Sequence, residues 1–116
     1  MSAENLKISK DAVYATGKRK DAVARVWMLK GTGRIFVNGK VLAQYFKRPV
    51  HQIAVERPLI ITKSKDIYDI VCTVKGGGMS GQAGAVTHGI SKALVVTSPE
   101  TRKIVKKNKM LTRDSR

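Results

Sequence analysis

One stretch of the chain joins a predicted strand, a glycine cluster and a predicted helix. Residues 67–75 (IYDIVCTVK) alternate in the way that a half-buried strand does. Residues 76–78 are three glycines, and residues 80–96 then carry apolar side chains on one helical stripe. Glycine loses more conformational freedom on folding than any other residue, so three in a row need a physical reason. The cluster predicts a close approach of the backbone to a nucleotide, to another anion or to another part of the chain.

Two nucleotide motifs can be tested against this cluster, and both are disfavoured. Gly76 and Gly81 have the spacing of a phosphate-binding loop, but Gln82 stands where that motif needs a lysine. Gly76, Gly78 and Gly81 match the dinucleotide fingerprint, with Glu100 in the place of its ribose-binding acid. That acid should end a second strand, whereas Glu100 stands at the start of a basic helix. The chain is also too short for a two-half nucleotide fold.

Two interpretations of the glycines remain, and they are compatible with each other. In the first, the helix lies unusually close to the sheet because Gly81, Gly84 and Gly89 have no side chains. Each glycine in a helix costs about 1 kcal/mol relative to alanine, and the close packing has to offset that cost. Alternatively, backbone N–H groups of the loop and of the helix N-terminus would face an anion. A phosphate of RNA is the anion that we expect.

The rest of the chain mixes strand-like and helix-like patterns. Residues 22–30 (AVARVWMLK) alternate, and residues 34–37 (RIFV) return after a GTG turn, which predicts a hairpin of these two strands. Helical patterns are expected in residues 40–46, from Pro49 up to a limit set by Pro58, and from Pro99 onward. These elements predict an α+β domain with helices packed on a sheet.

Length and charge indicate one domain that binds a polyanion. The chain has 116 residues and a formal net charge of +15, from 23 Lys and Arg residues against 8 acids. We expect a flexible arm in residues 1–11, a single α+β RNA-binding domain in residues 12–108 and the start of a basic extension in residues 109–116. No run of about 18 apolar residues predicts a membrane span, and no secretory signal opens the chain, so a cytoplasmic protein without a membrane partner is expected.

Residues that could carry catalysis or hold a metal are few and scattered. Cys72 is the single cysteine and falls in an apolar run, and His51 and His88 are the two histidines. Asp66 and Asp69 are the one close acidic pair, and their position at the start of a strand makes them an unconvincing catalytic dyad. We therefore expect no enzyme activity, no metal site and no cofactor.

The glycine run also carries a family resemblance. GGGMSGQAGAVTHGISKAL (76–94) closely resembles the signature of small-subunit ribosomal protein nine, the universal S-nine family. ATGKRKDAVARVWMLKGTGRIFVNG (15–39) is similar to the opening of that family, and TRDSR (112–116) is similar to the start of its C-terminal extension. The resemblance covers nearly all of residues 12–116, and its spacing looks like that of the bacterial form.

The resemblance implies both a fold and a role. The fold would be the ribosomal S-five domain-two-like α+β fold, a four-stranded sheet with helices packed on it. The role would be structural: binding ribosomal RNA in the head of the small subunit, beside neighbouring head proteins, in the cytoplasm. Family members send a basic tail toward the transfer RNA in the peptidyl site, but this sequence ends at Arg116, where that tail begins. The transfer RNA contact is therefore carried onto no residue here.

The candidate RNA-binding residues come from the glycine run and from two basic clusters. One cluster lies in the predicted loop TGKRKDA (16–22), and the other spans residues 101–116, where seven cations face one acid. The full set is Lys18, Arg19, Lys20, Arg25, Lys75, Gly76, Gly77, Gly78, Gln82, Arg102, Lys103, Lys106, Lys107, Lys109, Arg113 and Arg116. No interleaved aromatic pair suggests a stacking platform, and we expect Trp27 to be buried against a helix. A basic RNA-binding module outside the ribosome is the alternative.

Overall fold

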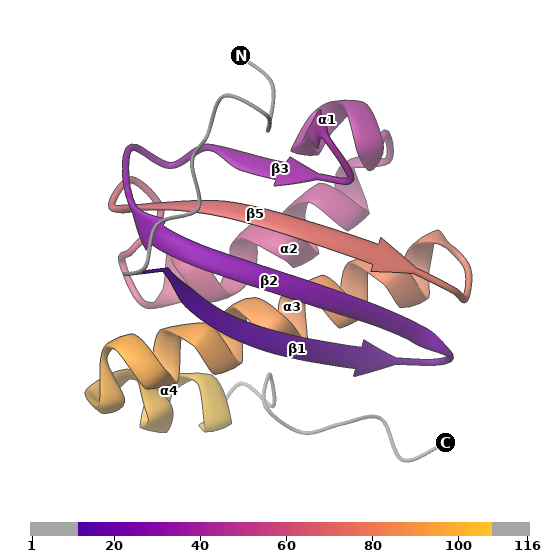
Figure 1. Ribbon diagram of the computed structural model, residues 1–116. Helices are drawn as coiled ribbons and strands as arrows, with labels where there is room; N and C mark the ends of the chain where they lie inside the picture. Colours follow the sequence, from indigo (N-terminus) through magenta and orange to yellow (C-terminus); the bar gives the residue numbers. More distant parts are fainter. Residues whose placement is uncertain (1–11, 108–116) are drawn as a thin grey trace.

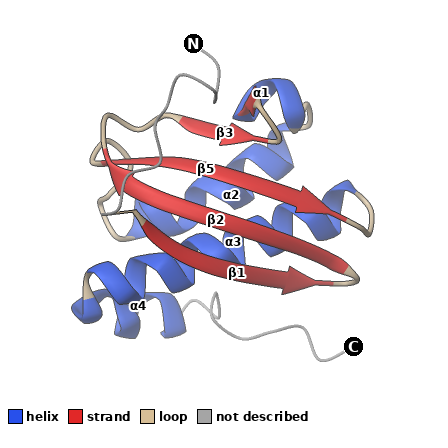
Figure 2. Ribbon diagram, viewed as in Figure 1, coloured by secondary structure: helices blue, strands red, loops and turns tan. Residues whose placement is uncertain are grey.

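The computed structural model describes residues 12–107, and side chains as far as Ile104. A five-stranded sheet forms one layer, and helices α2 and α3 cover one of its faces (Figures 1 and 2). The expected N-terminal arm (1–11) and C-terminal extension (109–116) lie outside the described residues. In chain order the elements are β1 (Val13–Arg19), β2 (Ala22–Lys30), β3 (Ile35–Val37), β4 (Lys40–Val41), α1 (Leu42–Tyr45), α2 (Pro49–Ile61), β5 (Tyr68–Lys75), α3 (Met79–Thr97), the 3₁₀ turn η2 (Pro99–Thr101) and α4 (Arg102–Lys107).

The order of the strands corrects two expectations. The order is β1-β2-β5-β3-β4, so the sheet has five strands where four were expected, because the short β4 pairs with β3. The predicted hairpin of residues 22–30 with residues 34–37 is wrong. Along its length β2 pairs with β1 on one side and with β5 on the other, which leaves it no edge for β3. Instead β3 runs parallel to β5.

The strand β1 also extends further than the sequence suggested. The predicted loop TGKRKDA (16–22) is largely strand, because every residue from Val13 to Arg19 pairs with a residue of β2. Only Lys20 and Asp21 remain between the two strands. The result is a tight antiparallel hairpin in place of a mobile loop.

The core lies between the sheet and the two long helices. The alternation predicted for the central strands is confirmed for the apolar residues: Ala22, Ala24, Val26 and Met28 of β2 and Ile70, Cys72 and Val74 of β5 are buried, while Asp69 is a buried residue of the opposite set. The predicted helical stripe is confirmed as well, since Ala83, Val86, Ile90, Ala93 and Leu94 of α3 are all buried. Within residues 12–107 no helix is both long and apolar enough to cross a bilayer.

The helix α2 does not stop at Pro58, as the sequence had suggested. It continues through Pro58 to Ile61, and Pro58 itself is buried. A proline inside a helix removes one backbone hydrogen bond and normally bends or ends the helix. Here the carbonyl oxygen of Ala54, which lacks an N–H partner at Pro58, lies 2.9 Å from the hydroxyl group of Thr87 on α3. A contact between two helices thus replaces the missing bond within α2.

Glycines allow α3 to lie close to the sheet, as predicted for two of three positions. A Cβ at Gly89 would lie 2.6 Å from Val26 Cγ2, and one at Gly84 would collide with the side chain of Arg19. At Gly81 the nearest atom would be 3.4 Å away, which is ordinary contact, so close packing does not require a glycine there. The tightest approach was missed: a Cβ at Gly17 would collide with the carbonyl oxygen of Ala85.

Candidate nucleic-acid interface

The β1–β2 turn presents three consecutive cations in a fixed geometry. Lys18 and Arg19 end β1, and Lys20 and Asp21 both have left-handed backbone angles, with φ of 46° and 69°. Two successive positive φ values are typical of the two-residue turn whose twist matches an antiparallel hairpin. All four side chains are exposed. The cations of this turn therefore project from a short, constrained connection.

The glycine loop packs against this same turn. Gly76 and Gly77 have φ of +82° and +58°, values that L side chains rarely adopt. A Cβ at Gly77 would lie 2.7 Å from the carbonyl oxygen of Lys20, and one at Gly76 would collide with the carbonyl oxygen of Asp21. The backbone of Gly76 and Gly77 therefore lies close to another part of the chain, the β1–β2 turn, which is one of the close approaches that the glycine run predicts.

The third glycine of the run differs from the first two. Gly78 has φ of −93°, and a Cβ there would have no atom within 4 Å. The expectation that residues 76–78 all exclude a side chain is therefore wrong at Gly78. This residue is instead the N-cap of α3, where no side chain accepts a hydrogen bond from the first turn of the helix.

The N-terminus of α3 adds backbone donors to the cations of the turn. The first N–H groups of a helix have no partner within the helix, and they favour an anion. The first turn of α3 has no acidic residue, and Lys75 at the end of β5 is exposed beside it. We call the Lys18–Asp21 turn, the Lys75–Gly78 segment and the first turn of α3 the turn end of the sheet.

Gln82, another predicted RNA ligand, has both ends of its amide occupied within the protein. Its Oε1 accepts a hydrogen bond of 2.6 Å from the hydroxyl group of Tyr45, and its Nε2 donates one of 3.1 Å to the carbonyl oxygen of Gly76. The side chain thereby braces the glycine loop against α1. These two hydrogen bonds give Gln82 a structural role that requires no bound RNA.

Arg25 and Lys75 lie on the face of the sheet that the helices leave open. On this face the strands bring side chains into rows: Lys18 beside Val23 and Lys75, then Thr16 beside Arg25 and Thr73. Arg25, Thr73 and Lys75 are exposed. Two of the predicted RNA-binding residues, Arg25 and Lys75, therefore share one exposed face of the sheet.

Trp27 lies on this open face too, which corrects two expectations. It alternates with the buried Val26 and Met28 and so points away from α2 and α3, where burial against a helix was predicted. It pairs across the strands with Tyr14, and the two ring centroids are 5.2 Å apart. No local pattern indicates this aromatic pair, because Tyr14 and Trp27 come from different strands.

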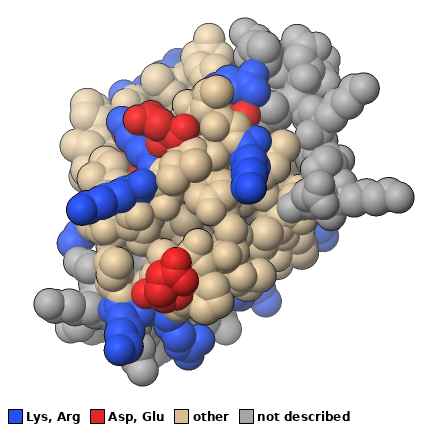
Figure 3. All heavy atoms as spheres, turned by 90° about the vertical axis from the view of Figure 1, so that its left-hand side faces the viewer, with Lys and Arg blue, Asp and Glu red and all other residues tan. Residues whose placement is uncertain are grey.

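The second predicted basic cluster lies at the other end of the molecule. Arg102 and Lys103 are exposed on α4, which lies near the C-terminal end of α3. The turn end of the sheet lies at the N-terminal end of α3 (Figure 1). Figure 3 views the end away from the turn and shows acidic side chains among the basic ones. The side chains of Lys106 and Lys107, and all of Lys109, Arg113 and Arg116, lie outside what the structure describes. Within the described residues the two clusters do not form one patch.

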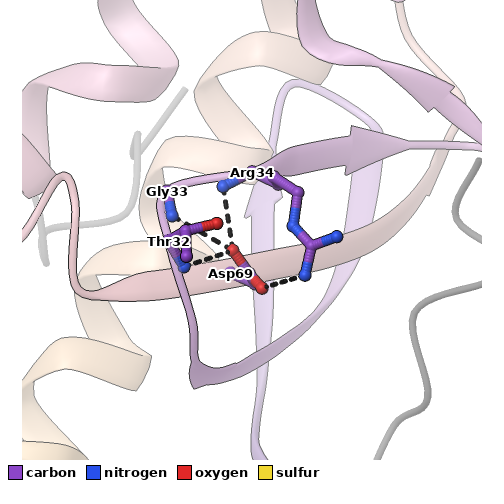
Figure 4. Close-up of polar contacts among 4 residues, drawn as sticks. All are labelled: Thr32, Gly33, Arg34 and Asp69. Carbon is purple, nitrogen blue, oxygen red and sulfur yellow. Dashed lines mark hydrogen bonds and ion pairs between the residues drawn. The ribbon is translucent and has the colours of Figure 1, made fainter. Parts of the chain in front are cut away.

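Asp69, one of the two acids weighed as a dyad, holds a loop in place (Figure 4). Its Oδ1 accepts hydrogen bonds of 2.9, 3.1 and 2.9 Å from the backbone N–H groups of Thr32, Gly33 and Arg34, and its Oδ2 is 2.8 Å from Arg34 Nη2. Burial opposes ionisation of this carboxyl group, but the hydrogen bonds and the charge of Arg34 outweigh it and lower the pKa of Asp69. Asp66 is exposed.

The cysteine and the histidines are also accounted for by packing. Burial raises the pKa of Cys72 to about 12, and its Sγ donates a 3.3 Å hydrogen bond to the carbonyl oxygen of Phe36. His51 is buried against the ring of Phe46. His88 Nδ1 accepts a hydrogen bond from the backbone N–H of Lys18. Within residues 12–107 no three potential metal ligands gather in one place.

Comparison with protein families gives one match that spans most of the chain. The model described as Ribosomal protein S9/S16 matches residues 17–116. The match begins within β1 and includes the β1–β2 turn, the glycine loop and α3.

Proposed function

The chain belongs to the ribosomal protein S9/S16 family, whose members are structural, non-enzymatic proteins of the small ribosomal subunit, and from this premise we propose that the turn end of the sheet is its main contact with ribosomal RNA. Lys18, Lys20 and Lys75 would bind phosphate oxygens there. The backbone N–H groups at the start of α3 would bind a further phosphate.

One observation carries this proposal: cations from two separate segments and the N-terminus of a long helix converge at one end of the sheet. The convergence is held by the backbone, since Gly76 and Gly77 pack on the carbonyl groups of Lys20 and Asp21. A contact surface that is already ordered loses less entropy on binding than a mobile loop would. Asp21 is the one acid in the turn.

The chemistry of the turn end favours recognition of the RNA backbone. Lysine side chains and backbone N–H groups bind phosphate and sugar oxygens, which position a protein without reading the bases. Double-stranded RNA is recognised mainly through such contacts and through its shape. We infer that the turn end contacts a folded region of the RNA by shape and charge.

The finer assignments follow the family resemblance. The chain would sit in the head of the small subunit beside other head proteins, with α4 as a second RNA contact through Arg102, Lys103, Lys106 and Lys107. Lys109, Arg113 and Arg116 would continue that contact. A tail beyond them would reach the peptidyl-site transfer RNA, and no residue described here is assigned to that role.

Incorporation into small-subunit particles tests the proposed function. The full chain is added to small-subunit RNA with the other small-subunit proteins, and the fraction that sediments with the particles is measured. Lys20→Ala with Lys75→Ala should require a several-fold higher protein concentration for half incorporation. The matched control, Lys30→Ala with Lys63→Ala, removes the same charge from two exposed positions away from the turn: Lys30 ends β2 at the opposite end of the strand, and Lys63 lies in the segment between α2 and β5. Failure of the parent chain to enter the particles would contradict the proposed function.

A further inference from the structure

The open face of the sheet carries a second kind of surface, which shares Lys75 with the turn end but also includes aromatic rings that phosphate binding there does not use. The helices α2 and α3 cover the other face, so the outward side chains of β1, β2 and β5 have no layer of described residues above them (Figures 1 and 2). A contiguous exposed apolar patch marks an interaction site more often than a single exposed side chain does, so neighbouring aromatic rings on this face make it a candidate contact surface.

Two aromatic rings lie side by side on this face. Tyr14 is 51% exposed, Trp27 is half-buried, and the ring planes meet at 47° with their centroids 5.2 Å apart. A cross-strand aromatic pair contributes roughly 0.2–1 kcal/mol to the stability of a sheet. That contribution explains the contact between the rings, but it does not explain why the Tyr14 ring is left half in solvent.

Cations follow the rings along the same strands. Arg25 stands two residues before Trp27 on β2, and Lys75 pairs with Val23 one row further along. Successive rows on one face are about 7 Å apart, because each residue of a strand rises by about 3.4 Å. Val23, Arg25, Thr73, Val74 and Lys75 line a shallow depression of about 310 Å³.

These cations have no acidic partner within the described part of the chain. The ion pairs there join Arg34 to Asp69 and Lys65 to Glu56, and neither involves Lys18, Arg25 or Lys75. The open face thus combines an exposed aromatic pair with unneutralised positive charge. A base with its phosphate offers the matching combination of a flat π surface and a negative charge.

We propose that the open face binds an unpaired nucleotide of RNA, with its base stacked on Tyr14 and Trp27 and its phosphates held by Arg25 and Lys75. The proposal rests on the proposed function, since it assumes that RNA is the ligand of this protein. The base must be unpaired, because the faces of paired bases are stacked inside a duplex. A protein partner would have to place carboxylate groups opposite both Arg25 and Lys75, whereas RNA carries a phosphate beside every base.

Trp27 makes the face directly observable, because it is the single tryptophan of the chain. The full chain is titrated with a single-stranded ten-nucleotide oligoadenylate and, separately, with an RNA duplex of equal phosphate number. Binding is followed by the anisotropy of a label on the RNA, and stacking is followed by quenching of the Trp27 emission. We expect both RNAs to bind and the single strand alone to quench Trp27.

Variants separate stacking from simple charge attraction. Tyr14→Leu keeps an apolar side chain but removes the ring, and should weaken single-strand binding by about 5- to 150-fold while duplex binding changes little. Tyr14→Phe keeps the ring and should bind the single strand as the parent chain does. Arg25→Gln should weaken single-strand binding more than the matched control Lys30→Gln, which lies at the far end of the same strand. Thermal unfolding of each variant checks that the fold is kept.

The outcomes distinguish this proposal from the proposed function. Binding of RNA by anisotropy without any change in Trp27 emission would overturn the stacking site and leave the ribosomal RNA contact at the turn end intact. Equal quenching by the duplex would also overturn the stacking site. A Trp27 response to another small-subunit protein but not to RNA would make the face a protein surface. Absence of RNA binding at low salt would contradict both the proposed function and the stacking site.

Discussion

The hydroxyl group of Thr87 lies 2.9 Å from the carbonyl oxygen of Ala54, which is the acceptor that Pro58 leaves without its helical partner. In an unbroken helix the N–H group of residue 58 would donate to that oxygen. Proline has no N–H group, so α2 could continue to Ile61 only if another donor satisfied the carbonyl. The hydroxyl group of Thr87 on α3 is the donor within reach, although its one proton is shared with the carbonyl oxygen of Ala83, 2.8 Å away in α3 itself. The contact with Ala54 also joins the two helices.

We expect Thr87→Val to lower the free energy of unfolding by about 0.5–1.5 kcal/mol, because it preserves shape and leaves the part-buried carbonyl group of Ala54 without a side-chain donor. Adding Pro58→Ala should recover part of this loss, since the new N–H group can bond Ala54. Urea unfolding of the two single variants and the double variant gives the coupling energy. Strictly additive effects would mean that Thr87 and Pro58 are not coupled.

The second and the third glycines of the loop should respond differently to substitution. Gly77→Ala forces a side chain into the left-handed region and toward the carbonyl oxygen of Lys20, and should cost about 2 kcal/mol or more. Gly78→Ser meets no atom and places a hydroxyl group at the N-cap of α3, so it should be neutral or slightly stabilising. Thermal unfolding measures both variants, and equal losses would contradict the different roles of the two glycines.

Asp69 should make the stability of the protein sensitive to acid. Its pKa is lowered in the folded state, so its stabilising contribution is complete above the ordinary value of 3.8 and is lost as the pH falls through the folded pKa. Asp69→Asn should lower the free energy of unfolding at pH 7 by roughly 2–4 kcal/mol, and this difference should shrink below pH 4. Urea unfolding between pH 2 and pH 7 provides the comparison. A difference that stays constant with pH would show that the charge of Asp69 is not involved.

Cys72 should resist thiol reagents for as long as the protein is folded. Burial holds its pKa at about 12, so at pH 8 the thiol is both covered and protonated. Labelling should therefore proceed only through transiently opened molecules and should accelerate in urea. Above pH 9 the unfolded chain ionises first, so Cys72 should reduce stability as the pH rises, and Cys72→Ala should lack that part of the pH dependence. Rapid labelling without denaturant would contradict the buried position.

The elements that were predicted well are those whose signals are local. Alternation in residues 22–30 and 68–75 and the helical stripe that starts at Ala83 depend on neighbours within a few positions, and the structure confirms them. The place of β3 was missed because the parallel pairing with β5 depends on contacts across a long crossover. Pro58 was misjudged because its compensating donor, Thr87, is far away in the chain.

The candidate site shows the same division. The cations of the β1–β2 turn are visible in the sequence, whereas their meeting with the glycine loop depends on a long-range contact. Trp27 was assigned to the wrong face because β2 carries apolar residues on both faces, Val23 and Leu29 included, so alternation alone does not say which face meets the helices. Tyr14 joins it only through the register of β1 with β2.

The dependence of RNA binding on salt tests the central claim most directly. With about six to eight phosphates contacted, log K against log salt for the full chain on a fragment of small-subunit head RNA should slope roughly −4 to −7. Lys18→Ala with Lys20→Ala should flatten the slope by about one to two units, while Lys30→Ala with Lys63→Ala should leave it nearly unchanged. A slope near zero for the parent chain, or equal flattening by both double variants, would contradict phosphate binding at the turn end.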